Sequence, residues 1–584
     1  MKNIKKLMAL VIAVVMVIGT MSLGAMADTV GQLSVNSTLS VSGLDAGDKV
    51  TVYKVLTWDE NSSTGWVYGD GVSSPATPLT TIVTSENGKN TISAAIASDL
   101  ASHLGTQYGA TDTVSGTSWT RENVESGLYM IIVEPATMGT VYNPIFVAAN
   151  YYGGGTSDPA DSANAIAISE NQASYNDSAM AKKTTIKLDK EAKGKDKEDG
   201  ITNNTLADGA YTTDVGEEID FSVTTHVPMY GTNYTAPKFI VEDVLTGLAL
   251  TGANVKVYKN DGGTKGAELT GVFTITGNAA DSTTYTISFN QDYLQGTNTT
   301  GEKIPATGQD ILIEYTAKVT DAAEKIVNQD NNTVTLKFST KPDDTTGAGR
   351  FRDETNHFTF SIDANLLGHN DINESSTEAI KVGVDSEGNY IVESSHYAWS
   401  DEWHGPLEGA QFKLYTDSGC TNPYTNTLYP SGVTVNSDST GRINIKGLDA
   451  GTYYLKEITA PTGYIKMQEA VEVVITADIE EEYTYTKDVD GTDVTIKTNK
   501  LNGYTVKIGG STTTYTITLE ESSANAQVAD RVQESSDDSE LKNTKGVELP
   551  STGGMGTTLF YVIGAILVLG AGIILVSKRR MSAN

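Results

Sequence analysis

Cysteine is almost absent from this chain of 584 residues, in which Cys420 is the single example. One cysteine excludes any disulfide within the chain, so the domains must take their stability from something else. Positive charge is also scarce, because 41 lysines and arginines face 73 aspartates and glutamates, a net charge of −32. Proteins that bind nucleic acid need a basic surface to displace phosphate counterions. The acidic balance argues against that class and fits a soluble, self-repelling exterior.

Sequence signatures of hydrolases are missing as well. The six histidines form no HExxH motif, no GxSxG is present, and nothing beside Cys420 marks a catalytic thiol. Acidic glycine turns at 385–388 and 488–491 resemble loose calcium loops, but such segments are usually only turns. We therefore expect neither an enzyme nor a protein that holds a metal or another cofactor.

Long apolar runs stand at the two ends of the chain. A lysine-containing start precedes an apolar stretch over 7–23 and the small-residue site Ala-Met-Ala at 25–27, which predicts a secretory signal peptide over 1–27. Near the other end, an apolar run over 559–576 is just long enough to span a bilayer. The basic residues at 578–580 then hold the tail inside.

Between the two ends the pattern predicts an all-β fold. Glycine is plentiful and proline sparse, with 56 and 14 residues, and alternating segments such as 49–55 recur between turn clusters. These features are typical of antiparallel β-sandwiches of the immunoglobulin-like kind. A short amphipathic helix is expected over 91–104, hairpins after 469, and a polar, acidic linker over 520–540. The expected segments are 1–27 (signal peptide), 28–180, 181–350 and 351–545 (three β-rich domains) and 546–584 (sorting signal, apolar helix and basic tail).

The pentapeptide before the C-terminal apolar run resembles the cell-wall sorting signal of Gram-positive surface proteins. Its residues are Leu549, Pro550, Ser551, Thr552 and Gly553. In that family a membrane-bound sortase cuts between the threonine and the glycine, here Thr552 and Gly553. The alternative is an ordinary single-span anchor preceded by a chance LPSTG. The resemblance implies a secreted protein that is fastened to the cell wall after a transient membrane stage.

An internal motif adds to this resemblance. Residues 453–464, YYLKEITAPTGY, are similar to the E-box YxLxETxAPxGY of sortase-assembled backbone pilins, with Ile458 in place of the motif's threonine. Those proteins are elongated chains of Cna-type domains, in which a buried acid promotes an amide bond between a lysine and an asparagine. Such chemistry needs a neutral lysine, which burial supplies by lowering its pKa, and a protonated acid.

In the third domain the resemblance implies Glu457 as the acid and Asn543, shortly before the sorting signal, as the amide. The lysine is less clear. The segment 358–366 looks like the opening strand of the family but carries Leu366 where a lysine is expected. We select Lys381, with Lys413 as the alternative, against the possibility that each is a solvated strand lysine.

The second domain resembles the Cna class in which an aspartate takes the place of the E-box glutamate. Asp243 matches that acid and Lys190 matches the lysine of the first strand. Relatives often have Tyr-Ser-Asn late in the last strand, but this chain has Phe-Ser-Thr at 338–340. Asn332 is therefore the expected partner, and the alternative is a domain without a cross-link.

Polymerisation in this family needs a lysine near the junction of the first two domains. The matching region, 175–184, is degenerate, but its register against Lys190 favours Lys183, with Lys182 as runner-up. An exposed lysine pair at a domain boundary can also be only a solvated linker.

The resemblance as a whole implies a structural subunit of a covalently polymerised pilus. A class C sortase would join Thr552 to Lys183 of the next copy. The alternative is a monomeric, wall-anchored adhesin with ligand contacts in the first domain. Implied partners are copies of the chain itself, class C and housekeeping sortases, minor or tip pilins, peptidoglycan, and host or matrix ligands, with no nucleic acid.

Overall fold

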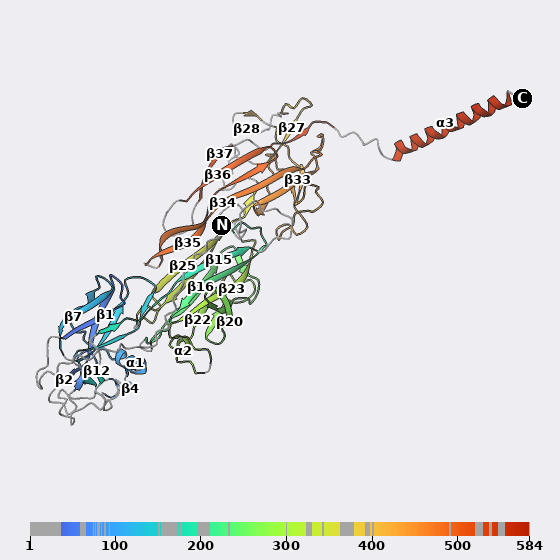
Figure 1. Ribbon diagram of the computed structural model, residues 1–584. Helices are drawn as coiled ribbons and strands as arrows, with labels where there is room; N and C mark the ends of the chain where they lie inside the picture. The colour runs from blue at the N-terminus through green and yellow to red at the C-terminus, as the bar shows by residue number, and fades with distance from the viewer. Residues whose placement is uncertain are drawn as a thin grey trace.

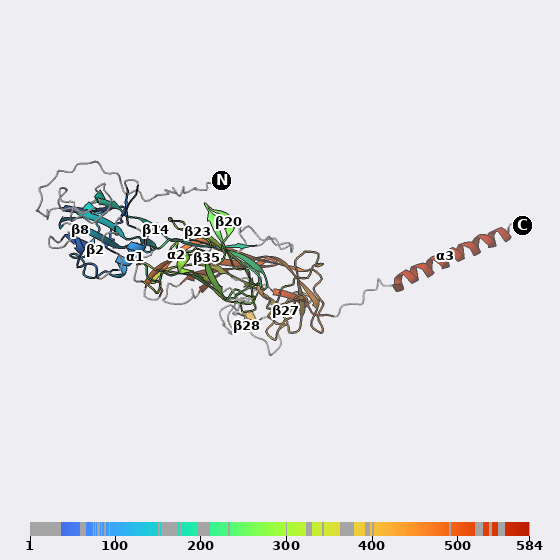
Figure 2. The same cartoon turned by 90° about the horizontal axis from the view of Figure 1, so that it is seen from below.

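The computed structural model describes residues 37–58, 66–149, 178–194, 211–322, 330–362, 379–391, 405–519, 529–535, 540–546 and 555–582, apart from short gaps within 74–93 and at 126, 232–233, 300, 342–343 and 490–491. The pairs 152–153, 173–174, 398–399 and 402–403 are described too. Figure 1 shows three β-rich bodies in a row, with one long helix standing away from them, and Figure 2 shows the same elongated outline from below. The predicted all-β, elongated architecture is confirmed.

The first domain is built around strand β8, which is buried on both faces. Tyr129 and Ile131 pack into one apolar cluster while Leu128 and Met130, on the opposite face, pack into another. The second cluster includes Leu100 of helix α1 (Ala94–Ser102), which confirms the predicted helix. One sheet has the order β13-β1-β7 and the other β10-β8-β2-β3, with β6 also on β2. The bounds are β1 (Ser37–Ser42), β2 (Lys49–Trp58), β3 (Trp66–Tyr68), β4 (Thr84–Glu86), β5 (Lys89–Thr91), β6 (Asp112–Thr113), β7 (Ser118–Val124), β8 (Gly127–Glu134), β9 (Thr140–Tyr142), β10 (Ile145–Ala149), β11 (Tyr152–Gly153), β12 (Ala173–Ser174) and β13 (Ser178–Met180).

The second domain is a sandwich of two sheets that bury their facing side chains. The first sheet has the order β15-β16-β23-β19-β20 with β18 also on β23, and the second has the order β21-β22-β17-β24-β25. Burial alternates along β23, so that Ile311, Ile313, Tyr315, Ala317 and Val319 all point into the core. The bounds are β14 (Lys183–Thr185), β15 (Leu188–Gly194), β16 (Glu218–Val227), β17 (Phe239–Leu245), β18 (Leu248–Leu250), β19 (Lys256–Asp261), β20 (Thr264–Glu268), β21 (Phe273–Thr276), β22 (Thr284–Phe289), α2 (Gln291–Leu294), β23 (Gln309–Val319), β24 (Asp330–Phe338) and β25 (Gly349–His357).

The boundary expected at residue 350 cuts through β25. That strand pairs with β24 from Phe338↔Gly349 to Asp330↔His357, so the sheet of the second domain continues past 350. The polar residues before β25 made the segment look like a domain end, whereas they form the turn between two paired strands. We therefore place the end of the second domain after His357.

The third domain contains a seven-stranded sheet with the order β31-β30-β33-β34-β35-β36-β37. The predicted hairpins are present, because β34 pairs with β35 and β35 with β36. The linker expected over 520–540 is wrong in part, since residues 529–535 form β37 on β36. Backbone pairing needs no apolar side chains, so the polar composition concealed this strand. The bounds are β26 (Phe360–Ser361), β27 (Ile380–Val384), β28 (Ala398–Trp399), β29 (Glu402–Trp403), β30 (Gln411–Tyr415), β31 (Thr434–Asn436), β32 (Lys446–Leu448), β33 (Gly451–Thr459), β34 (Val471–Val489), β35 (Thr492–Ile508), β36 (Ser511–Leu519), β37 (Ala529–Ser535) and β38 (Glu540–Thr544).

The long hairpin of β34 and β35 joins the third domain to the second. Asn356 of β25 donates its backbone N–H to Asn499 Oδ1 at 2.7 Å, and Asn499 Nδ2 donates to the Asn356 carbonyl at 2.9 Å. Tyr485 Oη also donates to Glu354 Oε1 at 2.6 Å. These buried polar contacts hold the two domains in line.

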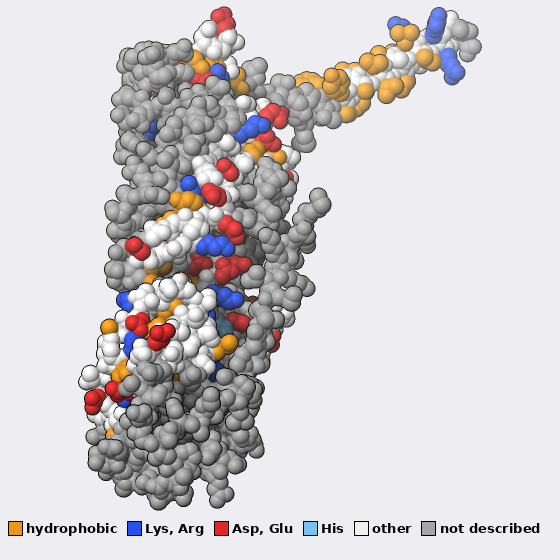
Figure 3. Space-filling model, turned by 60° about the vertical axis from the view of Figure 1, so that its left-hand side comes forward, with side chains coloured by type: hydrophobic (Ala, Val, Ile, Leu, Met, Phe, Trp, Pro, Cys, Tyr) orange, Lys and Arg blue, Asp and Glu red, His pale blue; other side chains and the backbone are white. Residues whose placement is uncertain are grey.

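Helix α3 (Met555–Met581) is apolar around its whole circumference. Its residues 560–581 are long enough to cross a membrane, and the most apolar 18-residue window within them has a mean hydropathy of 2.5. Figure 3 shows this apolar surface ending in basic side chains, which are Lys578, Arg579 and Arg580.

Candidate cross-linking sites

The second domain brings Lys190, Asp243 and Asn332 together in its core. Lys190 Nζ lies 2.6 Å from Asp243 Oδ1 and 2.7 Å from Asn332 Oδ1. Lys190 comes from β15 in one sheet, whereas Asp243 and Asn332 come from the neighbouring strands β17 and β24 of the other. All three residues are buried, with exposed fractions of 6%, 0% and 0%. A bond between Lys190 and Asn332 would therefore join the two sheets.

Two tyrosines complete this site, although no sequence motif marks them. Tyr285 of β22 and Tyr315 of β23 each donate a hydrogen bond to Asp243 Oδ2 at 2.9 Å. Tyr315 Oη also accepts a hydrogen bond from Asn332 Nδ2 at 2.8 Å. The alternation of β23 indicates that Tyr315 points inward, but sequence alone does not show which group it meets.

The electrostatics of the second-domain site favour a reactive amine. Burial lowers the pKa of Lys190, and this effect outweighs the opposing attraction of Asp243. Burial and the neighbouring Asp243 charge raise the pKa values of Tyr285 and Tyr315 well above the usual range. Both hydroxyls therefore stay protonated at any physiological pH.

The third domain brings Lys381, Glu457 and Asn543 together. Lys381 Nζ donates a short hydrogen bond to Asn543 Oδ1 and lies 3.4 Å from Glu457 Oε1. Asn543 Nδ2 donates to the same Glu457 oxygen at 3.0 Å. Glu457 Oε2 accepts the backbone N–H of Met467 at 2.6 Å, which fixes the carboxylate. The three exposed fractions are 1% or less.

Strand order explains this second cluster. Lys381 lies on β27, which runs parallel to β38, where Gly383 is opposite Asn543. Glu457 comes from β33 of the large sheet. Burial lowers the pKa of Lys381 to about 8, because the nearby Glu457 charge compensates only in part. The alternative Lys413 lies on β30 opposite Lys456 and is only half-buried, so the structure does not bring it into this cluster.

Each cluster can perform one reaction. A neutral lysine amine can attack the side-chain carbonyl carbon of the asparagine, and ammonia leaves as the new amide forms. The acid beside the amine can take up and return protons. The structure places the reacting groups in contact in both domains, and the covalent bonds themselves stay a prediction.

A third buried lysine, Lys54, lies in the first domain and was not selected from the sequence. It pairs with Glu125 at 2.5 Å, but 59% of the Glu125 side chain is exposed. Water therefore reaches this carboxylate, whereas Asp243 and Glu457, the acids of the other two domains, are fully buried.

Lys182 and Lys183, the two candidate lysines for joining one copy to the next, lie where the first domain meets the second. Lys183, on β14, pairs with Tyr142 of β9, and Lys183 Nζ forms an ion pair with Asp45 Oδ1 at 2.6 Å. About a third of the Lys183 side chain is exposed, at 32%. Lys182 is half-buried, and burial lowers the pKa of its amine. Residues 1–27 and 549–553, which carry the predicted signal peptide and sorting pentapeptide, lie outside the described residues.

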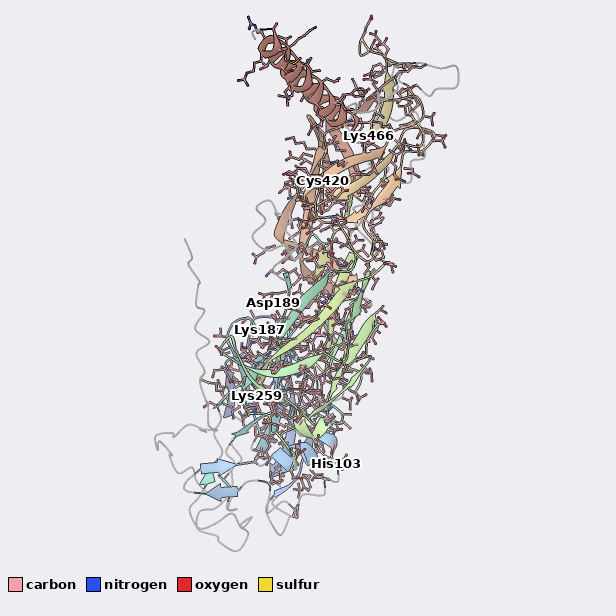
Figure 4. All side chains as sticks on the ribbon, turned by 90° about the vertical axis from the view of Figure 1, so that its right-hand side faces the viewer. His103, Lys187, Asp189, Lys259, Cys420 and Lys466 are labelled. Carbon is pink, nitrogen blue, oxygen red and sulfur yellow. The ribbon has the colours of Figure 1, made fainter. Side chains whose placement is uncertain are left out.

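Cys420 has no feature of a catalytic thiol in the described part of the chain. Burial raises the pKa of its thiol, which disfavours the reactive thiolate. Figure 4 shows it in the third domain, whereas His103 lies in the first. Within the described ranges, no group of three His, Cys, Asp or Glu side chains is arranged to hold a metal ion.

Comparison with known proteins agrees with this architecture. One family model, the prealbumin-like fold domain, matches residues 399–492, and another, the LPXTG cell wall anchor motif, matches 541–582. The trypsin-resistant surface T6 protein of Streptococcus pyogenes serotype M6 is 25% identical over 579 residues, covering 93% of this chain and 95% of that protein.

Two solved structures of pilins align with this chain. The T6 backbone pilin of serotype M6 Streptococcus pyogenes aligns at a TM-score of 0.49 and 16% identity, over 87% of this chain and 98% of that one. The full-length major pilin SpaD of Corynebacterium diphtheriae aligns at a TM-score of 0.41 and 16% identity, over 75% of this chain and 90% of that one.

The anchor motif and the tandem β-domains define the class: this is a surface protein fastened to the cell wall, as expected from its C-terminal end. Within that class the chain is similar to the T6 surface protein along nearly the full length of both.

Proposed function

We propose that this protein is the backbone subunit of a covalently polymerised pilus. The observation that carries the proposal is the order of parts along one elongated chain. An exposed lysine at the first domain junction is followed by two buried lysine–acid–asparagine clusters and then by a sorting signal. Such an order suits a rod whose units are joined end to end.

The joint forms in two steps. A class C sortase thiolate attacks the Thr552 carbonyl, the bond to Gly553 breaks, and the Gly553 amine leaves with a proton, so that Thr552 is held as a thioester. The Lys183 amine of the next copy then attacks this thioester, forms an amide bond and releases the sortase thiol. The Asp45 ion pair holds Lys183 Nζ at a fixed place on the surface. Lys182, whose pKa is lowered by burial, remains the alternative nucleophile.

The internal bonds would replace the missing disulfides. The Lys190–Asn332 bond closes a loop of 142 residues. By analogy with disulfide loops, it would remove denatured-state entropy equivalent to about 5 kcal/mol. An amide also resists reduction, which suits an exported protein.

The test of the joint is polymer formation by single-lysine variants in cells that carry the sortase. Lys183→Ala should abolish the detergent-resistant ladder of high-mass species, while Lys182→Ala should leave it. Lys187→Ala is the matched control, because Lys187 is an exposed lysine in the same stretch. A ladder lost only in Lys182→Ala moves the joint to the alternative lysine. A wild type without any ladder would sink the pilin proposal and favour a monomeric adhesin.

A further inference from the structure

The two clusters differ in what touches the nitrogen that must leave. In the third domain Asn543 Nδ2 donates directly to the carboxylate of Glu457 at 3.0 Å. In the second domain Asn332 Nδ2 donates to the Tyr315 hydroxyl at 2.8 Å, and that hydroxyl in turn donates to Asp243 at 2.9 Å. A tyrosine therefore stands between the acid and the departing nitrogen.

We propose that Tyr315 is a catalytic residue of the second domain, which carries a proton from Asp243 to the departing nitrogen of Asn332. Tyr285 contacts the acid at 2.9 Å and serves to position it. This inference rests on the proposed Lys190–Asn332 cross-link and assigns the route of one of its protons.

Two protons leave Lys190 as its ammonium group becomes an amide nitrogen. The Lys190 ammonium gives one proton to Asp243 Oδ1, 2.6 Å away, and becomes a nucleophile. The Nζ–Cγ bond forms, Asp243 passes its proton through Tyr315 to Nδ2, and Asp243 then accepts the second proton from Nζ. The Cγ–Nδ2 bond breaks, and the protonated Nδ2 leaves as ammonia. One of the two lysine protons thus departs with ammonia, and the other stays on Asp243, which ends as a neutral acid.

The hydrogen bonds of Tyr315 suit this relay once the amide carbon becomes tetrahedral. In the amide, Nδ2 is a donor, and Tyr315 accepts from it. In the tetrahedral intermediate Nδ2 gains a lone pair, so the same two contacts can reverse. The Asp243 carboxyl group rotates to bring its new proton from the Lys190 side to the Tyr315 side, after which Asp243 donates to Tyr315 Oη and Tyr315 donates to Nδ2. A hydroxyl can pass a proton in this way because it both donates and accepts.

Packing fixes the Tyr315 hydroxyl in place. Its ring stacks on Phe221 with a centroid distance of 5.1 Å, and it meets the Tyr285 ring in a T-shaped contact with a centroid distance of 5.1 Å. Tyr315 also comes from the same sheet as Lys190, and both face Asn332 from across the sandwich. The amine and the relay therefore approach the same amide group from one side of the core.

The experiment follows bond formation from the moment of synthesis. The processed chain, residues 28–552, is made in a cell-free extract, aliquots are quenched in acid, and the joined Lys190–Asn332 peptide is quantified by mass spectrometry. Tyr315→Phe should slow this bond by at least about 100-fold, the lower end of what a positioned proton donor contributes. Tyr285→Phe is the matched control and should change the rate by only a few-fold. The Lys381–Asn543 bond in the same molecules reports on folding and should form at the wild-type rate.

The outcomes are distinct. A Tyr315→Phe rate equal to that of Tyr285→Phe overturns the relay. A slower rate with a shifted pH midpoint overturns it too, because Tyr315 would then act through the ionisation of Lys190. If Tyr315→Phe does not fold, 3-fluorotyrosine at position 315 keeps the ring and the hydroxyl while strengthening the acid, and an unchanged rate would overturn the relay. A wild type that never forms the Lys190–Asn332 peptide rejects the cross-link itself.

Discussion

The second and third domains bring the same three chemical groups together from different arrangements of strands. In the second domain, Lys190 reaches across the sandwich to an asparagine on the opposite sheet. In the third, Lys381 and Asn543 lie on the adjacent parallel strands β27 and β38, and the acid comes from the large sheet. The acid is an aspartate supported by two hydroxyls in one case and a glutamate that touches the amide directly in the other.

This difference shows that strand topology does not define the site. What both domains share is a buried site in which an amine, a carboxyl group and a primary amide are in contact. The shorter aspartate is extended by the Tyr315 hydroxyl, whereas the longer glutamate reaches the amide nitrogen without help.

The largest effect is the loss of a bond when its acid is removed. The wild-type ectodomain should be lighter than its sequence mass by two ammonia molecules, about 34 Da, because each bond releases one. Asp243→Ala should lose only the second-domain bond and Glu457→Ala only the third-domain bond, as measured by intact mass. Glu242→Ala is the matched control, since Glu242 is the neighbouring carboxylate and pairs with Lys337 at the surface. Retention of both bonds in Asp243→Ala would contradict the assignment.

Stability gives the next largest effect. Asn332→Ala and Asn543→Ala each remove the cross-link of a long loop, of 142 and 162 residues respectively. Each should lower the free energy of unfolding of its own domain by about 5 kcal/mol. Urea titration with a fluorescence readout measures the loss. Lys413→Ala should leave both transitions unchanged, because that lysine lies outside the cluster.

The pH dependence of bond formation should follow the ionisation of the two attacking lysines. The attacking amine must be neutral, and burial lowers the pKa of Lys381 to about 8. The rate in the third domain should therefore rise with pH, level off above about 8 and fall about tenfold for each pH unit below it. The second-domain rate should also rise with pH, since burial lowers the pKa of Lys190. Quenched aliquots of Lys190→Ala and Lys381→Ala at pH 6 to 9 isolate each profile, and a flat third-domain profile would argue against a free-amine mechanism.

The smallest effect concerns the contact between the two domains. Tyr485→Phe removes the hydrogen bond to the buried Glu354 on β25, at 2.6 Å in the wild type. A buried carboxylate that loses a donor should cost about 1–3 kcal/mol. Thermal unfolding should show the third domain separating from the second at lower temperature. Tyr483→Phe serves as the control, because its ring lies beside that of Tyr485 on the same strand. Equal melting of the two variants would mean that the contact contributes little.

Much of both sites could be named from the sequence, but chiefly through resemblance. Glu457 stands in a long and specific motif, and Asn543 is located by its distance from the sorting signal. The structure places all six selected lysine, acid and asparagine residues in two buried clusters, although the bonds remain predictions. The sequence alone leaves Lys413 as an alternative to Lys381, and the pairing of β27 with β38 gives the physical reason for Lys381.

What the sequence could not supply depends on contacts between distant strands. Tyr285 and Tyr315 look like ordinary core tyrosines, and only the sandwich brings both hydroxyls to one oxygen of Asp243. Strand β37 and the continuation of the second-domain sheet past residue 350 were missed for a related reason. Their pairing lies in the backbone, which side-chain composition does not report.

The placement of the joint close to the first cluster has a mechanical consequence. With both internal bonds formed, tension that enters at Lys183 passes along 183–190, crosses to Asn332, follows 332–381, crosses to Asn543 and leaves through 543–552. The segments 191–331 and 382–542 are bypassed, so most of the second and third domains would carry no load and could not be pulled open. The first domain precedes Lys183 and therefore lies outside this path. It would carry no tension and would stay free to face the surroundings of the cell.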